Sequence, residues 1–429
     1  MEQYAKILLI AMPAFLLLVL FEKAYAWFVK KEPFRAMDLL SSLSSGYTNA
    51  IKDVLGLSVS ILTYGWMVQH WAVYTIESSV WAYVIAFVAL DFSGYWVHRM
   101  AHQINFFWNK HAIHHSSEEF NLACALRQSI SSFVNLFTFF LLPAALLGVP
   151  ATVIAVVAPL HLFAQFWYHT VHIGKMGVLE KIIVTPSHHR VHHAINPAYL
   201  DRNHGQIFIF WDKMFGTFQE ELPHVPPVYG ITRPVETWNP IKINFLHLWL
   251  LIQDAYRTNS WRDKLRLWFM PTGWRPADVA AQYPVKKIDD VYQFEKYAPK
   301  ASKWLLIWTW TQFLFTFALI NHLFTDMVHI GTPAIFGYGA FILLSVYAYS
   351  ELMDRNPQAW IWETAKNILG LALIYQTNWF NISQILPWAV YAIGAYFVLA
   401  TAVTWLFVRF DIAHDLPQSA PQLQEEMIV

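Results

Sequence analysis

The sequence is poor in charge and almost free of cysteine. Only 14% of its 429 residues are charged, whereas soluble domains carry about a quarter. Basic and acidic residues balance at 29 each, so no broad basic face is expected and nucleic acid is excluded as a partner. The single cysteine, Cys124, excludes an internal disulfide framework and a thiolate metal cluster. Any bound metal must therefore be held by nitrogen or oxygen.

What the sequence has in abundance is hydrophobic residues, which make up 56% of the chain. Several apolar runs are long enough to cross about 30 Å of hydrocarbon as helices. The first lacks a basic leader and a small-residue cleavage site, so it predicts a retained anchor. The runs predict an all-α integral membrane protein with about nine transmembrane helices, near residues 5–28, 54–68, 73–95, 133–147, 151–168, 304–324, 333–349, 361–375 and 385–408.

Basic residues near the ends of the runs predict the orientation. Those that follow the first, third and fifth runs are Lys30, Lys31, Arg35, Arg99, Lys110, Lys175 and Lys181. Because positive residues favour the cytoplasmic side, these ends are expected to face the cytoplasm, with the N-terminus outside and the C-terminus inside. The expected location is a bacterial inner membrane or the endoplasmic reticulum.

Histidines divide the chain unevenly. Thirteen of the 19 lie between His98 and His204. We therefore expect a membrane domain that carries the chemistry over residues 1–275, a cytoplasmic linker over 276–303, and a four-helix membrane region over 304–429.

Three histidine motifs have the spacing of metal ligands. They are "HRMAH", "HAIHH" and the "HRVHH" within "HHRVHH", and together they supply His98, His102, His111, His114, His115, His189, His192 and His193. Residues three or four apart share a helix face, so each H-x-x-H-H is expected to form one chelating trio. In "QFWYHTVH", His169 is expected to be a ninth ligand, and Gln165 could hold a metal-bound water.

The number of imidazoles predicts the number of metals. Imidazole suits zinc, copper, iron and nickel, but one ion cannot use eight or nine nitrogens. A structural zinc closes its shell with four ligands. The count therefore predicts two metals with open positions at the cytoplasmic membrane edge, which suits oxygen activation on a lipid.

Other polar residues lie close to the three motifs in sequence and are candidates for supports of the ligands or for structural groups. Asp91 lies two helical turns before His98, and we expect it, Glu118, Glu119, Asp201 and Asp212 either to accept from ligand imidazoles or to pair with arginines. Isolated histidines are expected to be structural: His161, His172, His204, His224 and His247. Aromatic residues that could wall a channel for the lipid chain are Phe106, Phe107, Trp108, Phe166, Trp167 and Tyr168.

The motifs "HRMAH", "HAIHHSSEEFNL", "TPSHHRVHH" and "WDKMFGTF" resemble the fatty acid hydroxylase/sterol desaturase superfamily of membrane di-iron enzymes, and most of all its alkylglycerol monooxygenase family. The resemblance covers about residues 40–276. It implies the nine histidines above as ligands, His188 as an adjacent residue, and two iron ions, with zinc as a substitute in a purified sample. It also implies O2 as co-substrate and tetrahydrobiopterin, or else a redox protein, as electron donor.

One position departs from the pattern. The family has a glutamate directly after the second histidine of the first motif, where this chain has Gln103. The change removes a carboxylate beside the expected metals, so it bears on the pterin dependence and on the substrate.

The expected activity is hydroxylation of a lipid CH2 group, so that a carbon next to an ether oxygen yields a hemiacetal that releases a fatty aldehyde. One alternative is a hydroxylase or desaturase of fatty acids, sterols or carotenoids. A second, of another class, is a metal transporter, which would place its ligands near the bilayer midplane.

Overall fold

The structure, a computed structural model, describes residues 2–33, 35–60, 62–132, 134–135 and 137–412. The chain forms two compact units, one over Gln3–Tyr297 and one that begins at Ala298. All thirteen clustered histidines belong to the first unit. The segment expected as a linker belongs to the first unit as far as Tyr297. At this residue the backbone N–H donates to the Glu118 carboxylate at 2.6 Å.

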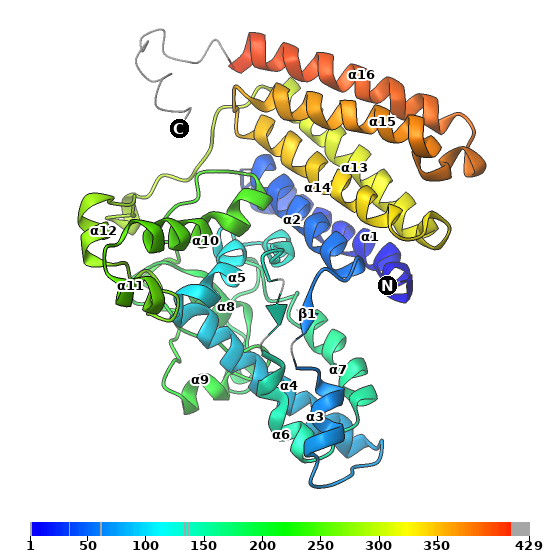
Figure 1. The fold of residues 1–429 in the computed structure, drawn as a ribbon. Coiled ribbons are helices and arrows are strands. Elements are labelled where there is room, and N and C mark those ends of the chain that lie inside the picture. The colour runs from blue at the N-terminus through cyan, green and yellow to red at the C-terminus, as the bar shows by residue number, and fades with distance from the viewer. Residues whose placement is uncertain (1, 34, 61, 133, 136, 413–429) are drawn as a thin grey trace. The chain divides into compact units, whose positions relative to one another are not determined.

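The regular secondary structure of the first unit is almost entirely helical in its described residues, with long loops between the helices (Figure 1). Its elements are α1 (Glu2–Tyr25), η1 (Ala26–Lys30), α2 (Ala36–Val54), β1 (Val59–Ser60), α3 (Tyr64–Trp71), α4 (Val80–Gln103), α5 (Asn105–His115), η2 (Leu122–Leu126), β2 (Val134–Asn135), η3 (Phe137–Leu141), α6 (Leu142–Leu146), α7 (Ala151–Phe163), η4 (Gly177–Lys181), α8 (Pro186–His193), α9 (Phe210–Met214), α10 (Pro240–Arg257), α11 (Trp261–Arg266), α12 (Ala277–Gln282) and η5 (Val291–Gln293). The two short strands pair in parallel, with Val59 opposite Val134.

A sharp turn joins the two helices that carry the first five histidines. Helix α4 begins where the Ser79 hydroxyl accepts from the backbone N–H of Ala82, and it ends at Gln103. Ile104 is extended, and α5 starts at once. The Asn105 side chain holds this turn by donating to the carbonyl of Leu267 at 3.0 Å. In consequence α4 and α5 pack against each other, and α10 packs on α5 (Figure 1).

Helix α8 carries the last histidines, and its sequence defines its start. Thr185 is extended at the N-cap and Pro186 follows at the first helical position, where a missing N–H costs nothing. All eight residues of the helix are buried, although most are polar. Such burial requires partners for the polar groups, and the imidazoles are therefore expected to contact one another or a ligand.

A buried ion pair fixes the end of α5 against α2. The guanidinium of Arg127, 1% exposed, donates to Asp38 at 2.8 Å, to the Ser42 hydroxyl at 3.0 Å and to the Ser116 hydroxyl at 2.8 Å. The Ser117 hydroxyl donates to the same Asp38 carboxylate. Because Ser116 directly follows the histidines of α5, this network positions the second motif.

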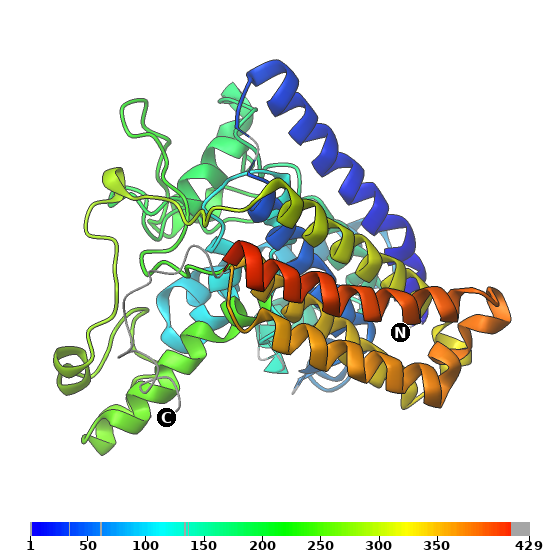
Figure 2. The same cartoon turned by 90° about the horizontal axis from the view of Figure 1, so that it is seen from above.

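The second unit contains α13 (Lys303–Ile330), α14 (Ala334–Met353), α15 (Ala359–Ile385), α16 (Ala389–Phe407) and η6 (Val408–Ile412). Each of the four α-helices packs beside the next in the sequence (Figure 2). Helix α15 bends at residues 378–381, where four successive φ angles are positive. A buried ion pair joins Lys366 to Glu363 at 2.7 Å inside this unit.

Five helical segments among the described residues are long and apolar enough to cross a membrane: Tyr4–Lys30, Val80–Gln103, Lys303–Ile330, Ala334–Met353 and Ala389–Ile412. The chain is thus a multi-pass membrane protein. The expected run 54–68 is not one helix, because α2 ends at Val54 and a strand follows. The run 133–147 includes residues 133 and 136, which lie outside the described residues, and its described part consists of the short elements β2, η3 and α6. The number of nine spans therefore stays a prediction.

Candidate metal centre

Nine imidazoles converge inside the first unit, and they are the nine expected as ligands. They form two groups, and within each group one possible ligand atom per residue lies within 4.8 Å of the others. The first group is His98, His102, His111, His115 and His192. The second group is His114, His169, His189 and His193.

The grouping corrects one expectation about the two H-x-x-H-H motifs. Neither motif forms a single trio. In α5, His111 and His115 join the first group and His114 joins the second. In α8 the order is reversed, because His192 joins the first group, with the outer two histidines of that motif in the second. Successive helical residues are rotated by about 100°, so the second histidine of each motif points well away from the third, which follows it directly.

In the first group the ring nitrogens approach one another closely. The Nε2 atom of His111 lies 2.8 Å from Nε2 of His98 and 3.0 Å from Nε2 of His115. The Nε2 atoms of His102 and His192 are buried and have no hydrogen-bond partner in the described part of the chain. Buried polar atoms are normally bonded, so these two nitrogens point to a ligand.

The second group has the same character. The Nε2 atom of His189 lies 2.8 Å from Nε2 of His169 and 3.1 Å from Nε2 of His193. His114 approaches His169 at 3.4 Å, again between Nε2 atoms. Convergent nitrogens at these separations are the arrangement that a bound cation requires.

Backbone carbonyls orient two ligands of the first group. The Nδ1 atom of His98 lies 2.8 Å from the carbonyl oxygen of His204, and Nδ1 of His192 lies 3.0 Å from that of Arg202. A carbonyl oxygen only accepts, so Nδ1 carries the hydrogen in both rings. Each Nε2 then presents a lone pair to the centre of the group, which is the support typical of metal-bound histidine.

Two further ligands are oriented in the same way. Nδ1 of His102 lies 3.1 Å from a carboxylate oxygen of Asp201, and Nδ1 of His169 donates to the carbonyl of Gln165 at 3.0 Å. In both rings Nε2 is thereby directed inward as an acceptor. Among the acids expected to support a ligand, Asp201 does contact one of the converging histidines, His102.

Burial keeps the imidazoles outside the membrane spans neutral. It lowers the pKa of His169 to about 4, and it lowers the pKa of the others well below the ordinary histidine value: His111, His114, His115, His189, His192 and His193. Only the neutral ring has a lone pair for a metal. The donor set, the inward lone pairs and the unpartnered nitrogens fit metal ions, and imidazole donors suit iron.

The expectation for Asp91 is not met. Its carboxylate accepts from Nε2 of His161 at 2.9 Å and from the backbone N–H groups of Ile207 and Phe208. The indole of Trp211 donates to it as well, at 2.9 Å. Asp91 thus holds the segment after α8 rather than His98, and His161 is structural, as expected. Helix spacing predicts that Asp91 and His98 share a face of α4. It could not show that the loop with Ile207 and Phe208 binds the Asp91 carboxylate.

Neither Glu118 nor Glu119 contacts a ligand histidine. Glu119 pairs with Arg35 at 2.9 Å and with Lys296 at 2.7 Å. Glu118 accepts from the backbone of Tyr297, and burial raises the pKa of this carboxyl to about 7. Both acids instead tie the loop after α5 to the end of the first unit.

Three other expected residues lie outside both groups. The Gln165 side chain donates to Gln206 at 3.3 Å and contacts Nδ1 of His161 at 3.2 Å, so only its carbonyl serves a ligand. The Nδ1 atom of His188 accepts from the backbone N–H of Thr185 at 3.4 Å at the start of α8. Gln103 is exposed at the end of α4.

The sequence named His204 and Asp212, on the segment after α8, but did not predict the roles that they have. The carbonyl of His204 binds His98, and Asp212 holds it in place by accepting from the N–H groups of His204 and Gly205, both at 2.7 Å. The His204 ring lies 5.0 Å from the His102 ring, between centroids. The "NHG…WD" order within this segment was the available signal, but it does not show which carbonyl faces a ligand.

Aromatic rings cover the second group, and Phe120 was not anticipated. Its ring lies 5.9, 5.9 and 5.2 Å from those of His169, His189 and His193, and the ring of Tyr229 stacks behind it at 5.0 Å. The Tyr168 ring lies 4.3 Å from that of His189. Apolar rings over the nitrogens exclude water.

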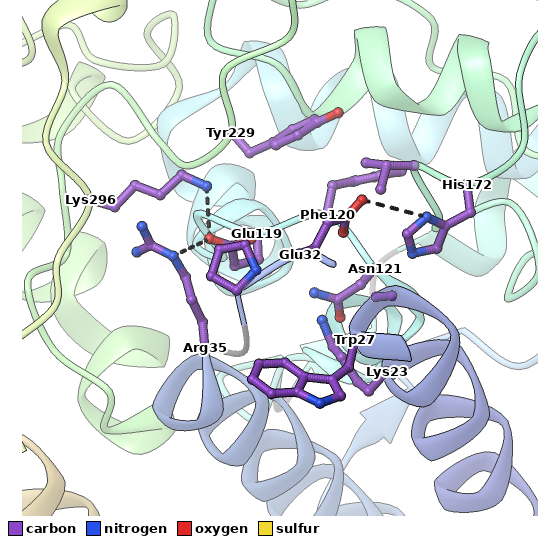
Figure 3. A pocket seen from close by; sticks show the side chains of 13 residues that line it. Lys23, Trp27, Glu32, Arg35, Glu119, Phe120, Asn121, His172, Tyr229 and Lys296 are labelled. Carbon is purple, nitrogen blue, oxygen red and sulfur yellow. Dashed lines mark hydrogen bonds and ion pairs between the residues drawn. The ribbon is translucent and has the colours of Figure 1, made fainter. Parts of the chain in front are cut away.

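Behind Phe120 lies a small polar cavity of about 90 Å³ (Figure 3). Arg35 and Lys296 both reach toward Glu119, and His172 faces Glu32 at 3.9 Å between Nδ1 and a carboxylate oxygen (Figure 3). None of the nine histidines lines this cavity.

A larger cavity of about 350 Å³ reaches the histidines directly. Four of the nine histidines line it. They are His102 from α4, His115 from α5, and His192 and His193 from α8. Trp108, one of the aromatic residues expected to wall a channel, also lines it. Cavities of this size hold small ligands, so the cavity is the route by which one can approach both groups.

We expect Asp201→Asn to weaken metal binding by about 10- to 100-fold, because the loss of a carboxylate behind a ligand imidazole has that effect. The measurement is the apparent dissociation constant of the metal in competition with a chelator. Asp289→Ala is the matched control, since Asp289 is exposed and has no contact with the histidines. Equal affinities in the two variants would show that the contact with His102 does not support the ligand.

Comparisons with known proteins give a consistent picture. Residues 83–217 match the fatty acid hydroxylase family model. The chain is 35% identical to an alkylglycerol monooxygenase of Homo sapiens over 85% of its own length and 81% of that protein. It is 34% identical to the Xenopus tropicalis enzyme of that name, over 84% and 80%, and 31% identical to that of Danio rerio, over 94% and 89%. No solved structure matches.

Proposed function

This chain belongs to the alkylglycerol monooxygenase family, within the fatty acid hydroxylases, and from that premise we propose how it acts on an ether lipid. It is an oxidoreductase that uses O2 to hydroxylate the carbon next to the ether oxygen of an alkylglycerol. One oxygen atom enters the C–H bond, and two electrons and two protons from a donor reduce the other to water. The resulting hemiacetal breaks its C–O bond and gives a fatty aldehyde and glycerol.

The observation that carries the proposal is the convergence of nine imidazoles in two groups. We propose that the groups hold two iron ions, one each, through His98, His102, His111, His115 and His192 and through His114, His169, His189 and His193. When bound, the irons supply the activation of oxygen that no side chain can provide.

The protein orients the ligand imidazoles and excludes water from the site. The carbonyls of His204 and Arg202 hold the rings of His98 and His192, so that the Nε2 atoms of these two rings face the centre of the first group. Phe120 and Tyr168 cover the second group and keep water from the reacting carbon. Exclusion of water limits side reactions of the activated oxygen.

The reductant and the membrane side belong to the same proposal. We infer tetrahydrobiopterin as electron donor, with a redox protein as the alternative. The exposed position of Gln103, outside both groups, means that the glutamine leaves the ligand set intact. The basic residues Lys30, Lys31 and Arg35 after the first span favour a cytoplasmic site, in a bacterial inner membrane or the endoplasmic reticulum.

The experiment that tests this function is turnover of a 1-O-alkylglycerol by iron-loaded protein in detergent, with and without tetrahydrobiopterin. We expect fatty aldehyde to be released in proportion to the O2 consumed, and only with a reductant present. Metal analysis should give two irons per chain. If neither the pterin nor a redox protein supports aldehyde release, ether cleavage is not the activity of this chain.

A further inference from the structure

The larger cavity carries an inference that rests on the proposed function and specifies its substrate. In an ether lipid the carbon to be hydroxylated is bonded directly to the ether oxygen, so the glycerol headgroup lies only a few bonds from it. The headgroup must therefore sit beside the metal ligands. The cavity of about 350 Å³ is lined by His102, His115, His192 and His193, whereas the smaller one behind Phe120 is lined by none of the nine.

The charges of the cavity wall are not balanced. Arg275 lines it but is neutralised by the fully buried Asp254, to which it donates twice, at 2.6 and 2.8 Å. The Asp201 carboxylate offsets one more positive charge. Asp201 therefore balances one of the two remaining cations, Arg233 and Lys287, so the described wall carries one net positive charge when Arg275 is counted as neutral with Asp254.

Arg233 is the cation that a ligand in this cavity would meet. No hydrogen bond or ion pair joins its guanidinium to another described residue, and both oxygens of Asp254, the acid that acts on its charge, are engaged by Arg275. Burial and the charge of Arg275 lower the pKa of Arg233, as expected where a positive charge lacks its counterion. The guanidinium is half-buried, which strengthens its interaction with an anion.

A second donor in the same wall also lacks a partner. The hydroxyl oxygen of Thr272 is buried and forms no hydrogen bond with any described residue. The imidazole of His247 cannot serve as a further cation, because burial lowers its pKa to about 4 and its Nε2 is bonded to the carbonyl of Asn105. The described wall therefore offers the planar cation of Arg233, the Lys287 ammonium and a hydroxyl, and its one carboxylate, Asp201, already contacts His102.

We propose that this cavity holds the headgroup of the lipid and that Arg233 selects a headgroup with a phosphate, so that the preferred substrate is a 1-O-alkylglycerol phosphate rather than the neutral alkylglycerol. The fork of an arginine matches the oxygens of a phosphate. A neutral glycerol would leave Arg233 without a counterion and would bind less tightly.

The test compares two lipids and two readouts on the full-length protein. Equilibrium binding and aldehyde release are measured for 1-O-hexadecylglycerol and its 3-phosphate, in the same detergent, with wild type, Arg233→Gln, Arg233→Lys and Lys286→Ala. We expect wild type to prefer the phosphate lipid. Arg233→Gln should lose about 10- to 100-fold in affinity and kcat/KM for that lipid while the neutral lipid changes less than about threefold, and Arg233→Lys should retain part of the preference.

Lys286→Ala is the matched control, because Lys286 is a neighbouring exposed cation that pairs with Glu236 and does not line the cavity. It should behave as wild type. Equal affinity of wild type for both lipids, or equal losses for both lipids in Arg233→Gln, would overturn the assignment. So would inorganic phosphate that binds as tightly as the phosphate lipid, since the cavity would then be a site for free anions. If neither lipid gives aldehyde, the proposed function fails, and the binding data still decide the role of Arg233.

Discussion

Replacing His111 by alanine is expected to remove at least one iron per chain and to lower turnover by about a thousandfold or more. The Nε2 atom of His111 contacts those of both His98 and His115 in the first group. Its loss therefore removes a central nitrogen donor from the proposed ligands. Activation of oxygen depends on the metals, which contribute several kcal/mol to such a barrier. Iron per chain is measured by elemental analysis, and turnover by aldehyde release.

His188→Ala is the matched control for this prediction. His188 is a buried histidine of the same motif as the ligands of α8, but it lies outside both groups and only caps that helix. The variant should lose some stability and keep its iron. If His111→Ala retained two irons per chain, or if His188→Ala lost as much iron, the ligand assignment would be wrong.

The second large effect is expected on the stability of the folded protein. Arg127→Met should lower the free energy of unfolding by about 3–5 kcal/mol, because it leaves the Asp38 carboxylate buried without its cation. Asp38 is 2% exposed and Arg127 is 1% exposed, so water cannot replace the lost partner. The measurement is equilibrium unfolding in mixed detergent micelles, with the thermal midpoint as a second readout.

Arg266→Met provides the comparison. Arg266 also pairs with an aspartate, Asp263 at 2.6 Å, but its side chain is 40% exposed. Exposed pairs contribute about 0–1 kcal/mol, so this variant should remain within 1 kcal/mol of wild type by the same measurement. Similar losses in the two variants would mean that the buried network does not hold α2 to the end of α5.

The choice of ligands could be predicted from the sequence, whereas their division could not. Histidines three and four apart share a helix face, so the spacing identified eight of the nine histidines that converge, and His169 followed from its place at the end of an apolar run. It does not decide which members of a trio meet the same metal, because that depends on where α5 and α8 lie relative to α4. His114 and His192, each the middle member of its motif, turn to the opposite group from their neighbours.

The supports of the ligands were harder to predict, and the reason is chemical. Asp201 is an acid and could be proposed from its type. The supports of His98, His192 and His169 are backbone carbonyls, which every residue has. Only the path of the chain shows which carbonyl faces a ring. For the same reason the sequence left Asp91 either as the support of a ligand imidazole or as the partner of an arginine, while the folded chain places His161 and the 207–211 segment on it.

The fold class followed from composition, but the span boundaries did not. Low charge and long apolar runs predicted a helical membrane protein, as found. Apolar length alone does not distinguish a span from a broken segment, and the run 54–68 is interrupted by a strand that pairs with residues near 134. A partner that distant in sequence leaves no local signal.

Because α5 and α8 each place histidines in both groups, the two metal positions are not independent. The first ion to bind would order the backbone of both short helices, and with it most nitrogens of the other group. The conformational entropy cost of forming the second position would then already have been met. Iron uptake by the metal-free protein would accordingly be cooperative, and chains that hold one ion would be rare beside empty and doubly filled ones.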